Sequence, residues 1–149
     1  MIQRKQTIFL LLAMACLIAC LCLPIGAIEP KGMGAVPVLF NYGLYADRAF
    51  NAQPIPFVDL VVAGGLTFIT IFLYKNRRLQ MRLCWVNIIL LLAWYGYYAF
   101  CMFAKFNALG TFHPRFAACL PFIGIVLIVL AHRGIKADEE LVRSMDRIR

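Results

Sequence analysis

The sequence predicts an all-α membrane protein, a four-helix transmembrane bundle, and three observations carry this prediction. Hydrophobic residues make up 63% of the 149-residue chain, charged residues make up only 15%, and the mean hydropathy is +0.81. Water-soluble chains have about 45–50% apolar and about 25% charged residues. Four long apolar runs with almost no charge divide the chain. The composition therefore argues against a water-soluble enzyme domain, a disordered chain or a coiled coil, and it favours a single membrane domain over residues 1–149.

The four apolar runs predict helices at residues 7–28, 55–74, 83–104 and 114–132. A hydrocarbon core about 30 Å thick is crossed by about 20 helical residues, and the first three runs reach that length. The fourth run is short, so its helix is expected to include polar residues at its outer end. Backbone N–H and C=O groups must be paired internally in lipid, which favours helices for all four runs.

The distribution of Lys and Arg predicts that both termini face the cytoplasm. With the N-terminus inside, eleven of the 15 Lys and Arg residues lie on the inner side and four on the outer side. The eleven are Arg4, Lys5, Lys75, Arg77, Arg78, Arg82, Arg133, Lys136, Arg143, Arg147 and Arg149. Cytoplasmic segments are enriched in Lys and Arg, so these counts favour an N-in, C-in bundle. The net charge of +8 then lies mostly on a face that attracts anionic lipid headgroups.

The connections between the predicted helices differ in length. A short inner link at 75–82 predicts a tight antiparallel hairpin between the second and third helices. The outer loop at 29–54 is much longer, and loops of that length are usually functional or disordered. It carries four aromatic residues: Phe40, Tyr42, Tyr45 and Phe50. We expect this loop to be partly ordered over the end of the bundle.

The first 20 residues also resemble a signal peptide, because Arg4 and Lys5 precede an apolar core. The four residues that end at Cys20 fit a bacterial lipobox, in which Cys20 would be lipidated after cleavage. The apolar run nevertheless continues past Cys20 to Ile25, which is long for a signal core and matches a membrane span. We therefore expect a retained first helix, with a cleaved lipoprotein as the alternative.

The cytoplasmic tail, residues 133–149, predicts a short amphipathic helix. The acidic pair at 138–139 suits a helix start, because negative charge is favoured in the first turn. Leu141, Met145 and Ile148 then fall on one apolar stripe. Such a helix can lie on the inner leaflet or dock on a cytoplasmic partner, and the sequence leaves both open.

Asp59 is the acidic residue within a predicted span, which makes it the candidate intramembrane polar site. Pro54 and Pro56 mark the start of that helix, so Asp59 is expected in its first turn at the outer interface. A carboxylate there caps free N–H groups and is favoured by the helix dipole. Asn87 is the nearest candidate by type for a second polar group, but it is expected at the opposite depth.

The cysteines and histidines show no catalytic or metal-binding pattern. None of the six cysteines lies in a Cys-x-x-Cys motif, so we expect them to pack as small apolar residues. His113 and His132 flank the fourth helix, about 28 Å apart at 1.5 Å per residue, which is too far to share a haem or metal ion. Trp94 and Tyr98 form an i, i+4 face that suits helix packing or a cavity for a quinone or lipid tail. We therefore expect no catalytic residue, cofactor or metal.

Three stretches together carry a family resemblance: MIQRKQTIFLLLA at the start, IFLYKNRRLQMRLCWVNIILLL in the middle and RGIKADEELVRSMDRIR at the end. They resemble a family of small Bacteroidota membrane proteins known as domain of unknown function 4293. The family pattern matches residues 1–4, 75–80 and 138–147, with Arg78 in place of a Lys. The resemblance implies a four-helix inner-membrane protein with a retained first helix. It implies no activity.

We interpret the sequence as a multi-pass protein of a bacterial inner membrane and a non-catalytic accessory or scaffold subunit of a membrane complex. Its expected partners are the lipid bilayer and one or more membrane proteins, with no nucleic acid. The candidate partner or lipid contacts are Lys75, Arg77, Arg78, Arg82, Arg143, Asp146 and Arg147. A small-solute transporter or channel is the alternative, and a membrane thiol or quinone redox protein is the second alternative.

Overall fold

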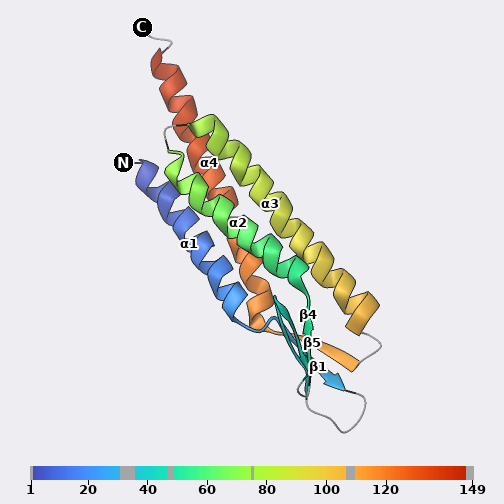
Figure 1. Cartoon of the computed structure of the whole chain (residues 1–149). Helices are drawn as coiled ribbons and strands as arrows, with labels where there is room; N and C mark the ends of the chain where they lie inside the picture. Colours follow the sequence, from blue (N-terminus) through green and yellow to red (C-terminus); the bar gives the residue numbers. More distant parts are fainter. Residues whose placement is uncertain (1, 31–35, 47–48, 75, 107–109, 147–149) are drawn as a thin grey trace.

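The computed structural model describes residues 2–30, 36–46, 49–74, 76–106 and 110–146. Within these residues, four α-helices pack lengthwise into a bundle, and a small antiparallel sheet covers one end of it (Figure 1). The expected class, all-α, is therefore corrected to a mostly helical fold with a sheet.

The first helix, α1 (Ile2–Cys22), ends earlier than the predicted 7–28. Pro24 lacks a backbone N–H, and a proline disfavours helical dihedrals in the residue before it, so the chain leaves the helix there. The residues that follow form a β-strand, β1 (Gly26–Pro30), instead of a further helical turn. The helix prediction failed here because hydrophobicity alone does not distinguish a helix end from a buried strand.

The segment predicted as the outer loop contains three strands: β2 (Val38–Phe40), β3 (Gly43–Ala46) and β4 (Ala49–Ala52). A fifth strand, β5 (Gly110–Pro114), pairs with β1, and the sheet order is β4-β3-β2-β1-β5 with every pair antiparallel. Residues 114–115, where the fourth helix was expected to begin, therefore belong to the sheet and its exit.

Of the remaining helices, the third and fourth are longer than predicted at the end opposite the sheet, whereas the second ends at residue 72 instead of the predicted 74. Helix α2 (Pro54–Phe72) is followed by α3 (Arg77–Phe100), which begins inside the predicted inner link and continues as a π-helical turn, Cys101–Phe106. After β5, a 3₁₀ turn (Phe116–Cys119) leads into α4 (Leu120–Asp146).

The tail does not form the separate amphipathic helix that was predicted, because α4 runs without a break to Asp146. Gly134 interrupts neither the helix nor its packing. A Cβ atom there would lie 3.0 Å from Cγ of the Gln6 side chain, so the glycine makes room for α1. The acidic residues at 138–139 lie within the helix and pair with another element instead of starting a new helix.

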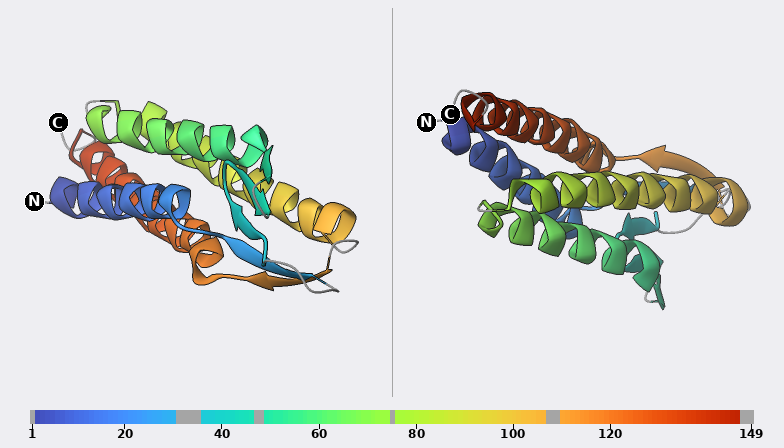
Figure 2. Two further views of the ribbon diagram at one scale, coloured as in Figure 1. Left: turned by 60° about the horizontal axis from the view of Figure 1, so that its bottom comes forward. Right: turned by 90° about the horizontal axis from the view of Figure 1, so that it is seen from above.

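The core runs along the axis of the bundle, and Figure 2 shows the helices side by side around it. Leu17 on α1, Leu60 on α2, Leu91 on α3 and Ile128 on α4 are fully buried. A Cβ atom at Gly124 of α4 would lie 3.6 Å from the Leu17 side chain, in van der Waals contact, so α1 and α4 approach closely there. The outward faces of the helices carry large exposed apolar residues, as expected where lipid is the solvent.

Three helical segments are long and apolar enough to cross a membrane: Pro54–Phe72, Arg77–Ala104 and Phe116–Ser144. The apolar part of α1, Gln6–Cys22, is shorter. These lengths and compositions indicate a membrane protein.

Candidate functional site

Charged residues gather where α3 begins and α4 passes beside it. We call this end of the bundle, which carries Arg77, Arg78, Arg82 and Lys136, the basic end, and the opposite end the sheet end. Arg77 Nη2 lies 3.1 Å from Asp138 Oδ2, and Arg77 Nη1 donates a hydrogen bond to the Asp138 carbonyl at 3.3 Å. One guanidinium thus holds both the side chain and the backbone of α4.

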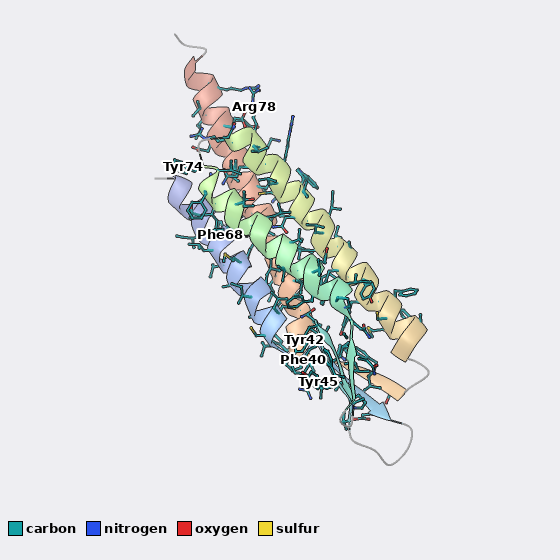
Figure 3. All side chains as sticks on the ribbon, viewed as in Figure 1. Phe40, Tyr42, Tyr45, Phe68, Tyr74 and Arg78 are labelled. Atoms are coloured by element: carbon teal, nitrogen blue, oxygen red, sulfur yellow. The ribbon has the colours of Figure 1, made fainter. Side chains whose placement is uncertain are left out.

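A second contact lies beside the first. Arg78 Nε is 3.5 Å from Glu139 Oε1, and Figure 3 shows Arg78 at this end. The Arg78 side chain is 75% exposed, and exposed ion pairs contribute little stability, roughly 0–1 kcal/mol. We call the two contacts, Arg77–Asp138 and Arg78–Glu139, the arginine latch. The arginine latch fixes the position of α4 along α3.

The other candidate contacts are placed differently. Arg82 is exposed on α3, and Arg143 is exposed near the end of α4. Asp146 is the last residue of α4, and its side chain lies outside the described part of the chain. Lys75 and Arg147 lie outside the described residues altogether. The structure thus engages Arg77 and Arg78 within the chain and leaves Arg82 and Arg143 on the surface.

The last turns of α4 project beyond the rest of the bundle, past the start of α1 and the link between α2 and α3 (Figure 1). We call residues 133–146 the α4 extension. Ile135 is fully buried, whereas residues 140–144 are exposed. Leu141 and Val142 are exposed there at 51% and 37%. An apolar pair next to Arg143 on a projecting helix is a surface that a partner can cover.

Asp59 does not act as the helix cap that was predicted. It lies after the first turn of α2, and its Oδ2 atom is buried without a hydrogen-bond partner among the described residues. The N-cap position is Gln53, whose side chain makes no capping bond, and Pro54 removes one of the donors that a cap would satisfy. The interpretation of Asp59 as a capping carboxylate is therefore wrong.

A buried polar pair lies between α2 and α3, away from Asp59. Asn87 Nδ2 donates a hydrogen bond to Thr67 Oγ1 at 2.5 Å, and Thr67 Oγ1 donates to the Ala63 carbonyl at 2.8 Å. Asn87 Oδ1 is buried and has no hydrogen-bond partner among the described residues. Asn87 was considered as a second polar group for Asp59, whereas its contact with Thr67 depends on how the two helices are set against one another.

The sequence analysis missed Asn41, which joins the sheet to the bundle. Asn41 lies in the two-residue turn between β2 and β3, and its side chain is fully buried. Asn41 Nδ2 donates to the Cys20 carbonyl at 2.6 Å, and Trp94 Nε1 donates to Asn41 Oδ1 at 3.1 Å. The Cys20 carbonyl belongs to the last turn of α1, where helix carbonyls lack intrahelical partners. The sequence offered one indication of this position, because Asn is a residue type that turns favour.

Trp94 and Tyr98 of α3 pack against one another within the bundle. The rings of Trp94 and Tyr98 are stacked, with centroids 5.2 Å apart and planes inclined by 9°, and Trp94 is 1% exposed. The Tyr98 hydroxyl donates to the Ile25 carbonyl at 3.0 Å. The Tyr95 hydroxyl donates to the Ala118 carbonyl at 2.7 Å and accepts from the Phe122 N–H at 3.0 Å. Tyr95 thereby ties α3 to the first turn of α4.

The outer face of the sheet carries a cluster of aromatic rings, part of which Figure 3 labels. Its members are Phe40, Tyr42, Tyr45 and Phe50, with ring centroids 5.1–6.1 Å apart. Strand alternation places Phe40, Tyr45 and Phe50 on one face and Leu39 and Leu44 on the buried face, and Tyr42 joins the cluster from the turn between β2 and β3. Tyr45 and Phe50 are about half exposed.

The cysteines form no disulfide, and the two histidines lie at opposite ends of the bundle. All six cysteines are free thiols, and Cys20, Cys84 and Cys101 are buried. His113 Nε2 lies 3.4 Å from Glu29 Oε2 at the sheet end, whereas the ring of His132 lies against Trp85 at the basic end. Within the described residues, no three His, Cys, Asp or Glu side chains gather closely enough to hold a metal ion.

The fold and its contacts define a class: a small helical protein with membrane-length apolar helices, a sheet over one end and a basic opposite end. A family profile matches residues 2–148 of the chain and is described as Domain of unknown function (DUF4293). The chain therefore belongs to that family. A search of curated proteins found no match.

Proposed function

We propose that the protein is a non-catalytic accessory or scaffold subunit of a membrane complex in a bacterial inner membrane. In this proposal all four helices cross the membrane, both termini lie in the cytoplasm, and the α4 extension docks on a partner. The apolar part of α1, Gln6–Cys22, lies at the lower end of the range of about 17–25 residues that helices use to cross a hydrocarbon core.

The orientation rests on the charge of the basic end. Arg77, Arg78, Arg82, Arg133 and Lys136 all lie near the ends of α3 and α4 that meet there. The side chains described at the sheet end include a single exposed Arg, Arg115. Cytoplasmic segments retain positive residues, so the basic end is assigned to the cytoplasm.

The observation that carries the docking proposal is the length of α4 together with its exposed apolar pair. Its 27 residues measure about 40 Å, about 10 Å more than a hydrocarbon core. The arginine latch holds the middle of the α4 extension, so its exposed end is presented in a defined direction. Leu141 and Val142 then offer an apolar surface of the kind that amphipathic helices present to grooves in a partner.

The test is affinity purification of the tagged full chain from its native membrane in mild detergent, with mass spectrometry of what co-purifies. We expect a stoichiometric membrane complex that is lost in a Leu141→Ser/Val142→Ser variant. Glu140→Gln is the control, because Glu140 is exposed on the same turn and is not part of that apolar pair. The proposal is wrong if the wild type is recovered alone, or if the double variant retains the same partners.

A small-solute transporter is the second candidate, and one observation favours it: Asn87 Oδ1 and Asp59 Oδ2 are both buried without hydrogen-bond partners among the described residues. Polar groups left unpaired within apolar helices are the kind that line solute paths. Flux of a solute into liposomes that falls in Asp59→Asn and in Asn87→Leu would favour this candidate over the scaffold. Equal flux in wild type and variants would exclude it.

A further inference from the structure

We propose that the adjoining surfaces of α3 and α4 at the basic end bind the headgroup of an anionic phospholipid. Two contacts set the register of these antiparallel helices. The ring centroids of Trp85 and His132 are 5.7 Å apart, and Arg78 Nε is 3.5 Å from Glu139 Oε1. Residues 79–84 of α3 therefore lie opposite residues 133–138 of α4.

Arg82 and Lys136 lie at one level within this stretch and supply its positive charge. Arg82 is exposed, and it makes no ion pair within the described part of the chain. The Lys136 side chain is 65% exposed, and its closest carboxylate oxygen, on Glu140, is 4.0 Å away at the limit of an ion pair. Arg82, without an ion pair among the described residues, and Lys136, with only this long one, match a phosphodiester, which accepts hydrogen bonds from both.

Along one face of α3 the side chains change from cationic to aromatic to aliphatic, which is the order of the groups of a phospholipid from its phosphate to its acyl chains. Arg78, Arg82, Trp85, Ile89 and Leu92 follow at intervals of four and three residues, so they lie on one stripe. Trp85, Ile89 and Leu92 are more than half exposed. The stripe thus runs from cations, through an aromatic ring of the type found at membrane interfaces, to aliphatic side chains. These match phosphate, glycerol and acyl chains in turn.

The aliphatic part of the stripe decides in favour of a lipid over a soluble anion or a protein. Ile89 and Leu92 lie well inside a membrane-length helix, where acyl chains are the solvent. The proposed partner surface at Leu141 and Val142 lies farther along α4, beyond the arginine latch. The lipid site and the docking surface are therefore separate and can be tested separately.

The two tryptophans provide a direct measurement. Trp85 is 57% exposed beside the proposed site, whereas Trp94 is buried in the bundle. The full chain is reconstituted in phosphatidylcholine vesicles that contain phosphatidylglycerol with brominated acyl chains. Matched vesicles contain brominated phosphatidylcholine at the same mole fraction. Bromine quenches tryptophan fluorescence on contact, so the ratio of the two quenching curves gives the relative association of the anionic lipid at Trp85.

We expect brominated phosphatidylglycerol to associate at least about fivefold more strongly, because each of the two cations near an anionic lipid contributes up to about that factor. The preference should fall to about onefold in Arg82→Gln/Lys136→Gln and persist in Arg143→Gln, which removes one positive charge outside the site. Arg82→Lys/Lys136→Arg should retain it. In the wild type, raising the salt from 0.05 M to 0.5 M should reduce it, which tests the proposal even if the double variant does not fold.

Three results would overturn the proposal. Equal quenching by the two lipids in the wild type would show that no headgroup preference exists. A preference unchanged in Arg82→Gln/Lys136→Gln would place the site elsewhere. A preference lost equally in Arg143→Gln would reduce it to the general charge of the basic end. None of these results bears on partner docking at Leu141 and Val142.

Discussion

At the scale of single residues, Asn41 shows how one polar side chain joins two parts of the molecule. Its amide satisfies the Cys20 carbonyl at the end of α1 and accepts from the Trp94 indole of α3. Both partners are buried, so removing the amide leaves a carbonyl and an N–H without partners. An unsatisfied buried polar group costs about 1–3 kcal/mol, which is a large part of the stability of a domain.

We therefore expect Asn41→Ala to destabilise the fold by about 2 kcal/mol or more, and to lower the apparent melting temperature by about 4–8 °C. Thermal unfolding of the detergent-solubilised protein, followed by circular dichroism, measures this change. Asn51→Ala is the control, because Asn51 is exposed on β4, where it lies opposite Leu44 of the neighbouring strand β3. Equal melting temperatures for the two variants would contradict the role given to Asn41.

At the scale of elements, the arginine latch determines how α4 ends. Helices in water need tertiary contacts or favourable pairs to persist beyond the core, and the latch supplies them at Asp138 and Glu139. The Asp138 carboxylate also lies beside the first residue of α3, where the helix dipole favours negative charge. The α4 extension is therefore supported from one side at its middle, and its last turns are free of the bundle.

Removing the latch should loosen the α4 extension without affecting the core. In Arg77→Gln/Arg78→Gln we expect amide exchange over residues 138–146 to be about fivefold faster, the equivalent of about 1 kcal/mol. Hydrogen–deuterium exchange with mass spectrometry measures this. Asp138→Asn/Glu139→Gln should give the same change, and combining all four substitutions should add little more, because both pairs of substitutions break the same contacts. Fully additive effects would show that the latch residues act on other partners.

At the scale of the whole molecule, the two ends of the bundle differ in chemistry. One end carries a sheet with an exposed aromatic cluster, and the other carries cations and the α4 extension. Aromatic residues are enriched at both membrane interfaces, whereas Lys and Arg are enriched on the cytoplasmic side. The asymmetry therefore favours one orientation of the bundle over the other.

Labelling by a membrane-impermeant maleimide tests the orientation. In a Cys22→Ala/Cys119→Ala background, which removes the two exposed native thiols, we expect Tyr45→Cys to be labelled in intact spheroplasts. Arg143→Cys should be labelled only in inverted vesicles. Spheroplast labelling of Arg143→Cys with protection of Tyr45→Cys would reverse the proposed orientation, and labelling of both from one side would mean an even number of spans between them instead of the proposed three.

Local composition determined much of the molecule. The apolar runs of the sequence predicted four helices, and four helices are present in the described residues, three of them long enough to cross a membrane. The family was also evident from local stretches of sequence, and the family match confirms it. These features are readable because a helix satisfies its own backbone bonds within one segment, so local hydrophobicity is sufficient to specify it. The positive-inside orientation was read in the same way and stays a prediction.

Tertiary structure alone decided the sheet, the length of α4 and the contacts of the candidate sites. Strands β1 and β5 lie far apart in the sequence, so neither indicates the other locally. Asn41 and Trp94 are 53 residues apart, and Arg77 and Asp138 are 61 apart. Sequence periodicity describes the neighbours of a residue along the chain, whereas these contacts depend on how whole elements are set against one another. That is why the acidic residues of the tail were predicted to begin a helix and are instead held against α3.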